Sequence, residues 1–401
     1  MESESKLAPL LEQAALFIVM TAVLARWWVS GSASPGINTF FHLLILVGAM
    51  VWLLSAALRP KWVFRIAWSA APLCLFSLMG IVSVMWASFR LTAIEHALAY
   101  FSCFILFLLV LNVFGPERRH LTDLLLFSAV FSISIYALLQ RVWILEYVRS
   151  LPEAALFQSP EGRARLMSNE VFGTFHYPNA LAGFLTLTMP LLTGSLLASW
   201  KHLAMIPRIL KASTLLSGGA ALALTGSKGG WMATAVAGIV FATLALTRHQ
   251  PRLRRILLGT GLAAGGGLVM LMIAGPLAPA KLGRSMQIRD VYWSASIKIA
   301  KDHPLGVGLD NFQEYYPQYR SEVQQEVTKA HNDYLQVLVE TGFPGLLLLL
   351  LFLALILRSA LATGPPLPPP SVTPSERPVL VVAGIVSILL ASSLAHVFLD
   401  L

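Results

Sequence analysis

The chain has 401 residues, of which 56% are hydrophobic and 12% are charged. A soluble domain carries roughly twice that share of charge, so the composition excludes an ordinary globular protein, although the length could hold two or three domains. The net charge of +9 lies between long apolar blocks and not on a basic tail or an amphipathic face, which argues against a nucleic-acid partner. The composition predicts an integral membrane protein.

Eleven apolar blocks of the sequence approach the length of about 20 residues that a bilayer-spanning helix needs. Backbone groups in lipid must be hydrogen-bonded within their own segment, and barrel strands would show short alternating patterns, so each block is expected to be a helix. We therefore predict an all-α polytopic membrane protein. The expected spans are residues 11–29, 37–58, 67–87, 93–114, 121–143, 176–199, 209–226, 229–247, 256–275, 343–361 and 379–399.

The orientation of the chain follows from the basic residues of its short loops. Residues 1–13 are polar and lack the features of a signal peptide, so the first block is expected to remain as a span. The two short loops at 30–36 and 88–92 contain Arg90 as their only basic residue. Lysine and arginine are instead frequent in four other short loops, residues 59–65, 115–120, 200–211 and 248–255. Because basic short loops stay in the cytoplasm, we expect a cytoplasmic N-terminus.

The same assignment divides the chain into successive segments. Two long loops fall on the outer side, and long loops are translocated largely regardless of charge. The segments are N-terminal spans (1–143), a first periplasmic loop (144–175), central spans (176–275), a large periplasmic loop (276–342), and C-terminal spans (343–401) with a proline-rich cytoplasmic linker (364–378). Cys74 and Cys103 lie inside apolar blocks and fit neither a disulfide framework nor a zinc site.

The large loop is rich in aromatic residues and is therefore expected to fold. A helical stretch from Arg289 should end near Lys301, where a proline and two glycines follow within the segment 303–308. A second helix should begin after His331, because Asn332 and Asp333 are good N-cap residues. Gly342 should end that helix, and Pro344 should open the last long one.

His331 would then lie at the start of a helix near the membrane surface. A histidine there can accept a proton from a hydroxyl group near neutral pH. The alternative is a hydrogen-bonded structural histidine, and spacing alone leaves both open.

Three further basic residues could bind an anion. Arg163 and Arg165 precede the turn-rich entry to the span at 176, where they could bind a phosphate or anchor lipid headgroups. Lys228 lies in a tight turn between two spans, as an interfacial anchor or as a cation for an anionic ligand. The aspartates of the outer loops are scattered, so no metal site is expected.

Three stretches together resemble one family. The first is Arg165 with Gly173-Thr174-Phe175 and the run 178–182, and the second is Ser227-Lys228-Gly229-Gly230. The third combines Arg289, Trp293, the run 303–308, Phe312, the run 331–336 and Glu340-Thr341-Gly342. In this order they are similar to the O-antigen ligase and polymerase superfamily, which includes bacterial O-linked oligosaccharyltransferases. The resemblance covers about residues 165–345.

The resemblance implies a GT-C-class glycosyltransferase that works without a metal or other cofactor. It would move a glycan from undecaprenyl pyrophosphate to an acceptor hydroxyl, such as lipid A–core in lipopolysaccharide biosynthesis, at the periplasmic face of the bacterial inner membrane. His331 would be the catalytic residue. Arg165 and Arg289 would bind the pyrophosphate, with Arg163 and Lys228 as further candidate ligands.

The sequence also leaves alternatives open. The family usually has arginine at the position of Lys228, and lysine keeps the charge but loses the bidentate contact. The family often has one more span than the eleven counted, which would fit a chain cut at Leu401. Within the enzyme class the alternatives are a polysaccharide polymerase and a protein O-oligosaccharyltransferase. Outside it the alternative is a transporter, although the spans hold few of the ionisable residues that transporters place near the bilayer midplane.

Overall fold

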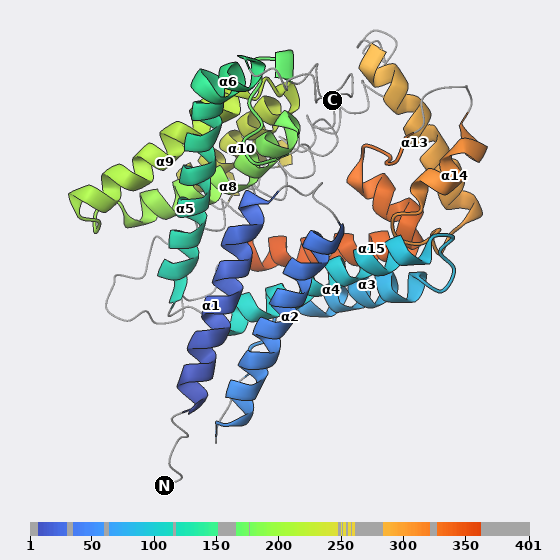
Figure 1. Cartoon of the computed structure of the whole chain (residues 1–401), viewed down its shortest axis with the longest axis horizontal. Coiled ribbons are helices and arrows are strands. Elements are labelled where there is room, and N and C mark those ends of the chain that lie inside the picture. The colour runs from blue at the N-terminus through green and yellow to red at the C-terminus, as the bar shows by residue number, and fades with distance from the viewer. Residues whose placement is uncertain are drawn as a thin grey trace. The chain divides into compact units, whose positions relative to one another are not determined.

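The computed structural model describes residues 7–29, 35–59, 64–114, 118–150, 166–175, 177–247, 284–320 and 327–361, with a few more between 250 and 260. Every regular element in these ranges is helical, which confirms the predicted fold class (Figure 1). The longer helices are α1 (Leu7–Trp28), α2 (Pro35–Ala57), α3 (Ala70–Ser83), α4 (Arg90–Asn112), α5 (Arg119–Leu139), α8 (Pro178–Ser199), α9 (Met205–Leu224), α10 (Lys228–Leu246), α13 (Arg284–Asp302) and α15 (Asp333–Leu361). Three shorter ones are η2 (Gln140–Ile144), α6 (Leu145–Ser150) and α14 (Phe312–Tyr319).

Seven of the described helices are long and apolar enough to cross a membrane. They cover residues 7–28, 36–57, 90–112, 120–150, 178–199, 228–246 and 333–359. The expected span at 67–87 contains α3, whose 14 residues reach only about 21 Å and fall short of the roughly 30 Å hydrocarbon core. The expected span at 209–226 corresponds to α9, which is helical but is not one of these seven helices. The expected spans at 256–275 and 379–399 lie almost wholly outside the described residues.

The helix that begins with α5 is longer than the sequence indicated. A loop was expected from residue 144, but the chain passes through the π-helical turn η2 and continues as α6 to Ser150. π-helical turns are rare and are frequently found at functional sites. Periodicity does not reveal such a turn, because every residue in it is still helical.

The chain forms two compact units. The first unit contains Met1–Val23, Ala33–His120 and Gly259–Arg358, and the second contains Leu24–Ser32, Leu121–Leu258 and Ser359–Leu401.

In the first unit, α4 packs against both α2 and α3 (Figure 1). At one end of these helices, Glu12 of α1 forms ion pairs with Arg59 and Arg118. At the other end, the amide of Phe89 donates to the side chain of Asn311 at 2.7 Å. The short loop before α4 therefore contacts the large loop of the expected periplasmic side, whereas the two arginines belong to loops of the expected cytoplasmic side.

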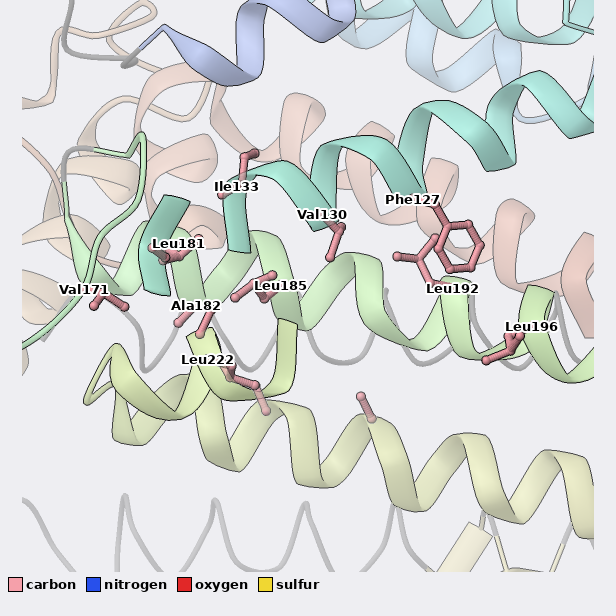
Figure 2. Packing of buried hydrophobic residues seen from close by; sticks show 14 residues of the cluster. Phe127, Val130, Ile133, Val171, Leu181, Ala182, Leu185, Leu192, Leu196 and Leu222 are labelled. Carbon is pink, nitrogen blue, oxygen red and sulfur yellow. The ribbon is translucent and has the colours of Figure 1, made fainter. Parts of the chain in front are cut away.

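In the second unit, α8 packs against α9 and α10. Figure 2 shows its core, in which side chains of α5 face leucines of α8. The buried leucines of α8 recur at helical spacing and so form one continuous face. The labelled core residues are Phe127, Val130, Ile133, Val171, Leu181, Ala182, Leu185, Leu192, Leu196 and Leu222.

Candidate functional site

The large loop folds around its own buried aromatic core. The helices α13 and α14 pack together, and the fully buried side chains of Phe312 and Tyr316 stack on one another. Tyr292 of α13 packs edge-on against Tyr316 with ring centroids 5.7 Å apart. In its described residues, 284–320 and 327–342, the expectation that this loop is folded and helical is confirmed.

The segment after α13 is fixed to the first part of α15 by backbone hydrogen bonds. The amide of Val307 donates to the carbonyl of Val339 at 2.9 Å, and that of Gly308 donates to the carbonyl of Glu340 at 3.0 Å. The amide of Phe343 donates back to the carbonyl of Pro304 at 3.0 Å. These bonds join two parts of the third sequence stretch that are more than 30 residues apart.

Two glycines make this close approach possible. Gly306 has a φ of 85°, and a Cβ atom there would lie 2.4 Å from the carbonyl oxygen of Glu340. Gly342 has a φ of 69°, and its Cβ would lie 2.3 Å from the carbonyl oxygen of Pro304. Only glycine meets both demands, a left-handed backbone and no side chain.

Gly342 also divides α15, because its backbone is non-helical within the helix. The expectation that one helix ends there and another opens at Pro344 is confirmed. The start of the first part is capped by Asn332, whose side-chain oxygen accepts from the amides of Tyr334 (3.1 Å) and Leu335 (3.3 Å). The cap of this helix is therefore Asn332 and not Asp333, which is its first residue.

His331 directly precedes this cap and has a φ of 50°. Few residues other than glycine adopt this left-handed conformation, although histidine does so more readily than most. Its half-buried ring lies against that of Tyr292, with centroids 5.7 Å apart and planes inclined by 33°. Burial raises the pKa of the Tyr292 phenol, so Tyr292 presents a neutral ring and a hydroxyl donor to its surroundings at neutral pH.

Arg289 lies in α13 one turn before Tyr292. Residues three apart on a helix are neighbours on the same face. The first unit therefore brings the backbone of Arg289 to within one helical turn of the residue that contacts His331.

In the second unit, the first and second sequence stretches lie together. The amide of Val171 donates to the carbonyl of Leu224 at 3.1 Å. The side chain of Glu170 covers Gly226, where a Cβ would lie 2.7 Å from the Glu170 carboxylate. The loop that follows Arg165 is thus attached to the turn that contains Lys228.

The same loop is anchored by the π-helical turn. The buried side-chain oxygen of Gln140 accepts from the amides of Phe172 and Gly173, both at 2.9 Å. Thr174 donates its hydroxyl to the carbonyl of Trp27 at 2.6 Å. Gly173 and Thr174 of the first stretch, and Phe172 directly before them, are therefore fixed by hydrogen bonds to other elements.

The second stretch forms a capped helix start. Ser227 is the N-cap of α10, and its hydroxyl accepts from the amide of Gly230 at 3.1 Å. Lys228 is the first residue of α10 and is exposed. A helix N-terminus carries partial positive charge, so the dipole and the lysine reinforce one another toward an anion.

The structure describes three of the five predicted site residues. His331 and Arg289 lie in the first unit, and Lys228 lies in the second. Arg163 and Arg165 lie outside the described residues. Arg149 nonetheless fixes the backbone just beyond them, since its guanidinium donates to the carbonyls of Leu166 and Ser168 at 2.6 and 2.7 Å.

Sequence reasoning did not select several residues that organise these sites. Tyr292 was recognised as aromatic but not as a neighbour of His331, although its position three residues after Arg289 was a signal. Gln140 gave no signal, because its role depends on the π-helical turn. Among the described residues, no three His, Cys, Asp or Glu side chains are arranged to hold a metal ion.

The fold and these sites define an all-helical, multi-span membrane protein with a folded helical loop next to a spanning helix. The family model described as O-antigen ligase matches residues 212–350, about a third of the chain, and supports the resemblance to the O-antigen ligase and polymerase superfamily. That family is glycosyltransferase-like and acts on lipid-linked glycans and their acceptors. The matched range includes Lys228, Arg289 and His331 but not Arg163 or Arg165. A search of curated proteins finds no match.

Proposed function

We propose that this protein is an O-antigen ligase-type glycosyltransferase. It moves a glycan from undecaprenyl pyrophosphate to an acceptor hydroxyl, with lipid A–core as the acceptor. The observation that carries the proposal is the placement of His331 within the matched range. The residue lies between a capped helix start and the ring of Tyr292, one turn from Arg289 along α13.

The proposed reaction is a displacement at the anomeric carbon of the donor sugar. The acceptor oxygen forms a bond to that carbon, the bond to the pyrophosphate oxygen breaks, and the hydroxyl proton passes to the imidazole of His331. Lipid pyrophosphate leaves as the second product. Because it is already a good leaving group, the protein must mainly position the two substrates and stabilise the growing negative charge.

We propose that basic side chains, and not a metal ion, stabilise that charge. Arg165 and Arg289 would hold the pyrophosphate, and Arg163 and Lys228 would be further ligands. The location of Lys228 supports its share of this role, because the exposed lysine stands at the N-terminus of α10.

The proposed location is the periplasmic face of the bacterial inner membrane, with a cytoplasmic N-terminus. Two contacts in the first unit support this orientation. Arg59 and Arg118 meet at Glu12, near the start of α1. Ser88 lies 3.3 Å from the hydroxyl of Tyr315, so the loop before α4 contacts the large loop.

Deletion of the gene in its host tests the proposed reaction. Lipid-linked intermediates and surface glycan would be analysed in the deletion strain and in strains complemented with wild type, His331→Ala or His202→Ala. His202 is an exposed histidine of the α8–α9 connection and serves as the matched control. We expect full-length glycan to accumulate on undecaprenyl pyrophosphate in the deletion and His331→Ala strains, while the acceptor remains bare.

Other results would identify one of the alternative activities. Single repeats transferred to the acceptor would indicate a polymerase. Loss of glycan from proteins, with normal lipopolysaccharide, would indicate a protein O-oligosaccharyltransferase. Lipid-linked glycan that is trapped on the cytoplasmic leaflet would indicate a transporter.

A further inference from the structure

We propose that Gln336 and Glu340 are positioning residues that hold His331 in the conformation needed for proton transfer. This inference rests on the proposed function, because it assigns the support of the same histidine. Neither residue need touch substrate. They act through the backbone of Ala330, the residue that directly precedes His331.

The contact between these residues is a short chain of hydrogen bonds. The amide of Ala330 donates to the side-chain oxygen of Gln336 at 2.7 Å. The side-chain nitrogen of Gln336 donates to the carboxylate of Glu340 at 2.5 Å. Gln336 and Glu340 are four residues apart and therefore neighbours on one face of α15.

These two hydrogen bonds fix which end of the Gln336 side-chain amide faces the backbone of Ala330. A backbone N–H can only donate, so it requires the oxygen of Gln336. The carboxylate of Glu340, when ionised, can only accept, so it requires the nitrogen. With an apolar residue at position 340, the nitrogen of Gln336 would lose its acceptor, and only the Ala330 amide would still hold the side chain in place.

The backbone of His331 needs such support. Its φ of 50° is a conformation that persists only when the surroundings impose it. On one side, the side chain of Asn332 is held by the amides of Tyr334 and Leu335. On the other side, Gln336 holds the amide of Ala330. Because both flanking residues are bonded to the same helix, His331 has little freedom to leave this conformation.

The backbone bonds that join the loop to α15 do not use the side chain of Glu340. The bond from Gly308 uses the backbone carbonyl of Glu340, and the bond from Val307 uses that of Val339. Any residue at position 340 would supply the same carbonyl. A carboxylate that is 4% exposed is costly unless it is paired or hydrogen-bonded. Its partners are the side chain of Gln336 and the amide of Asp310, so Glu340 both orients Gln336 and holds the backbone at Asp310.

A reciprocal exchange tests this role. In Gln336→Glu, two carboxyl groups face each other and can keep the contact only by taking up a proton. In the double variant Gln336→Glu/Glu340→Gln, the new glutamine donates to the new carboxylate, which still accepts from the Ala330 amide. The matched controls are Gln318→Glu and Glu314→Gln, both at exposed positions of α14.

The assay uses full-length purified protein and undecaprenyl-pyrophosphate-linked glycan extracted from the deletion strain. We expect Gln336→Glu to lower kcat by roughly tenfold to a hundredfold, as a misplaced catalytic group does. The KM for the donor should stay near wild type, because the lost interaction supports only the chemical step. The double variant should recover most of the lost kcat, and the two controls should not differ from wild type.

The outcomes separate the two claims. If wild type transfers glycan but folded Gln336→Glu keeps its kcat, or the folded double variant is no better than Gln336→Glu, the positioning role is wrong and the proposed function stands. Thermal unfolding in detergent identifies variants that are not folded. In that case Gln336→Leu, which removes both bonds without adding a charge, decides by the same measure of kcat. If wild type itself transfers no glycan, the proposed function fails, and the inference fails with it.

Discussion

The proposed binding of a pyrophosphate by Arg289 depends on the shape of its side chain. A guanidinium can make two parallel hydrogen bonds to phosphate oxygens, whereas an ammonium is a single point charge. We therefore expect Arg289→Lys to lower kcat/KM nearly as much as Arg289→Ala, as measured by glycan transfer from the lipid-linked donor. Lys298→Ala, at an exposed position of the same helix, is the control. Full activity of the lysine variant would show that only the charge matters.

Lys228 allows the opposite exchange. The family that the chain resembles usually has arginine at this position. Lys228 is exposed at the start of α10. If it binds the pyrophosphate, Lys228→Arg should keep or raise kcat/KM, and Lys228→Ala should lower it. Equal activity of all three proteins would leave Lys228 as an interfacial anchor.

At the residue scale, the sequence identified a candidate for the chemistry but not the residues that this candidate contacts. It selected His331 from its position before good N-cap residues, and the structure places it directly before the Asn332 cap. It could not predict that Tyr292 contacts His331, because this contact depends on how α13 packs against a segment almost 40 residues away. The same holds for Gln336, whose partner is a backbone amide that no side-chain pattern identifies.

At the scale of elements, the junction between the loop after α13 and the break in α15 should be sensitive to a single methyl group. Gly306→Ala places a Cβ against the carbonyl of Glu340 in a left-handed backbone. We expect a loss of stability of about 1 kcal/mol or more, measured as thermal unfolding in detergent.

Gly238→Ala is the matched control for this substitution. It lies in the interior of α10, and its Cβ would meet nothing within 4 Å. Alanine is favoured over glycine in a helix by about 0.5–1 kcal/mol, so this variant should be at least as stable as wild type. Destabilisation by both substitutions to the same extent would contradict the assigned role of Gly306.

The π-helical turn makes a separate prediction. Gln140→Met preserves size but removes the oxygen that accepts from the amides of Phe172 and Gly173. An unsatisfied buried donor costs about 1–3 kcal/mol, so the variant should unfold at a lower temperature. It should also have lower activity, because the loop after Arg165 loses its anchor. A variant with unchanged stability and activity would show that the anchor is dispensable.

Elements were predicted from sequence with uneven success, for physical reasons. Long apolar blocks predicted α1, α2, α4 and α8 well, because a bilayer allows almost only helices. The extension of α5 through η2 to Ser150 was missed, since residues 144–150 are polar enough to suggest a loop. The division of α15 at Gly342 was predicted correctly, because glycine followed by proline is a strong local signal.

For the whole molecule, the orientation in the membrane can be measured directly. Lys201 and Lys301 are both exposed, and the basic-loop rule places them on opposite sides. In a variant without Cys74 and Cys103, a thiol reagent that cannot cross the inner membrane should label Lys301→Cys in cells with a permeabilised outer membrane. Lys201→Cys should be labelled only after lysis. The reverse pattern would place the large loop in the cytoplasm and rule out a periplasmic reaction.

The arrangement of the whole chain could be predicted only in part. Hydropathy located most of the described helices, because apolar blocks depend on local composition, whereas the number and direction of the spans stay predictions. The pairing of the first stretch with the second, through Val171 and Leu224, depends on the packing of α8 against α9. No pattern within either stretch encodes that contact.

The most direct test of the account is glycan transfer by purified protein in the presence of EDTA. The assay compares wild type with His331→Ala, using extracted lipid-linked glycan and lipid A–core from the deletion strain. We expect wild type to remain active without free metal ions, and folded His331→Ala to be slower by roughly 10²–10⁴-fold, the usual contribution of a general base. Near-normal turnover by folded His331→Ala, or loss of wild-type activity that added divalent metal restores, would contradict the account.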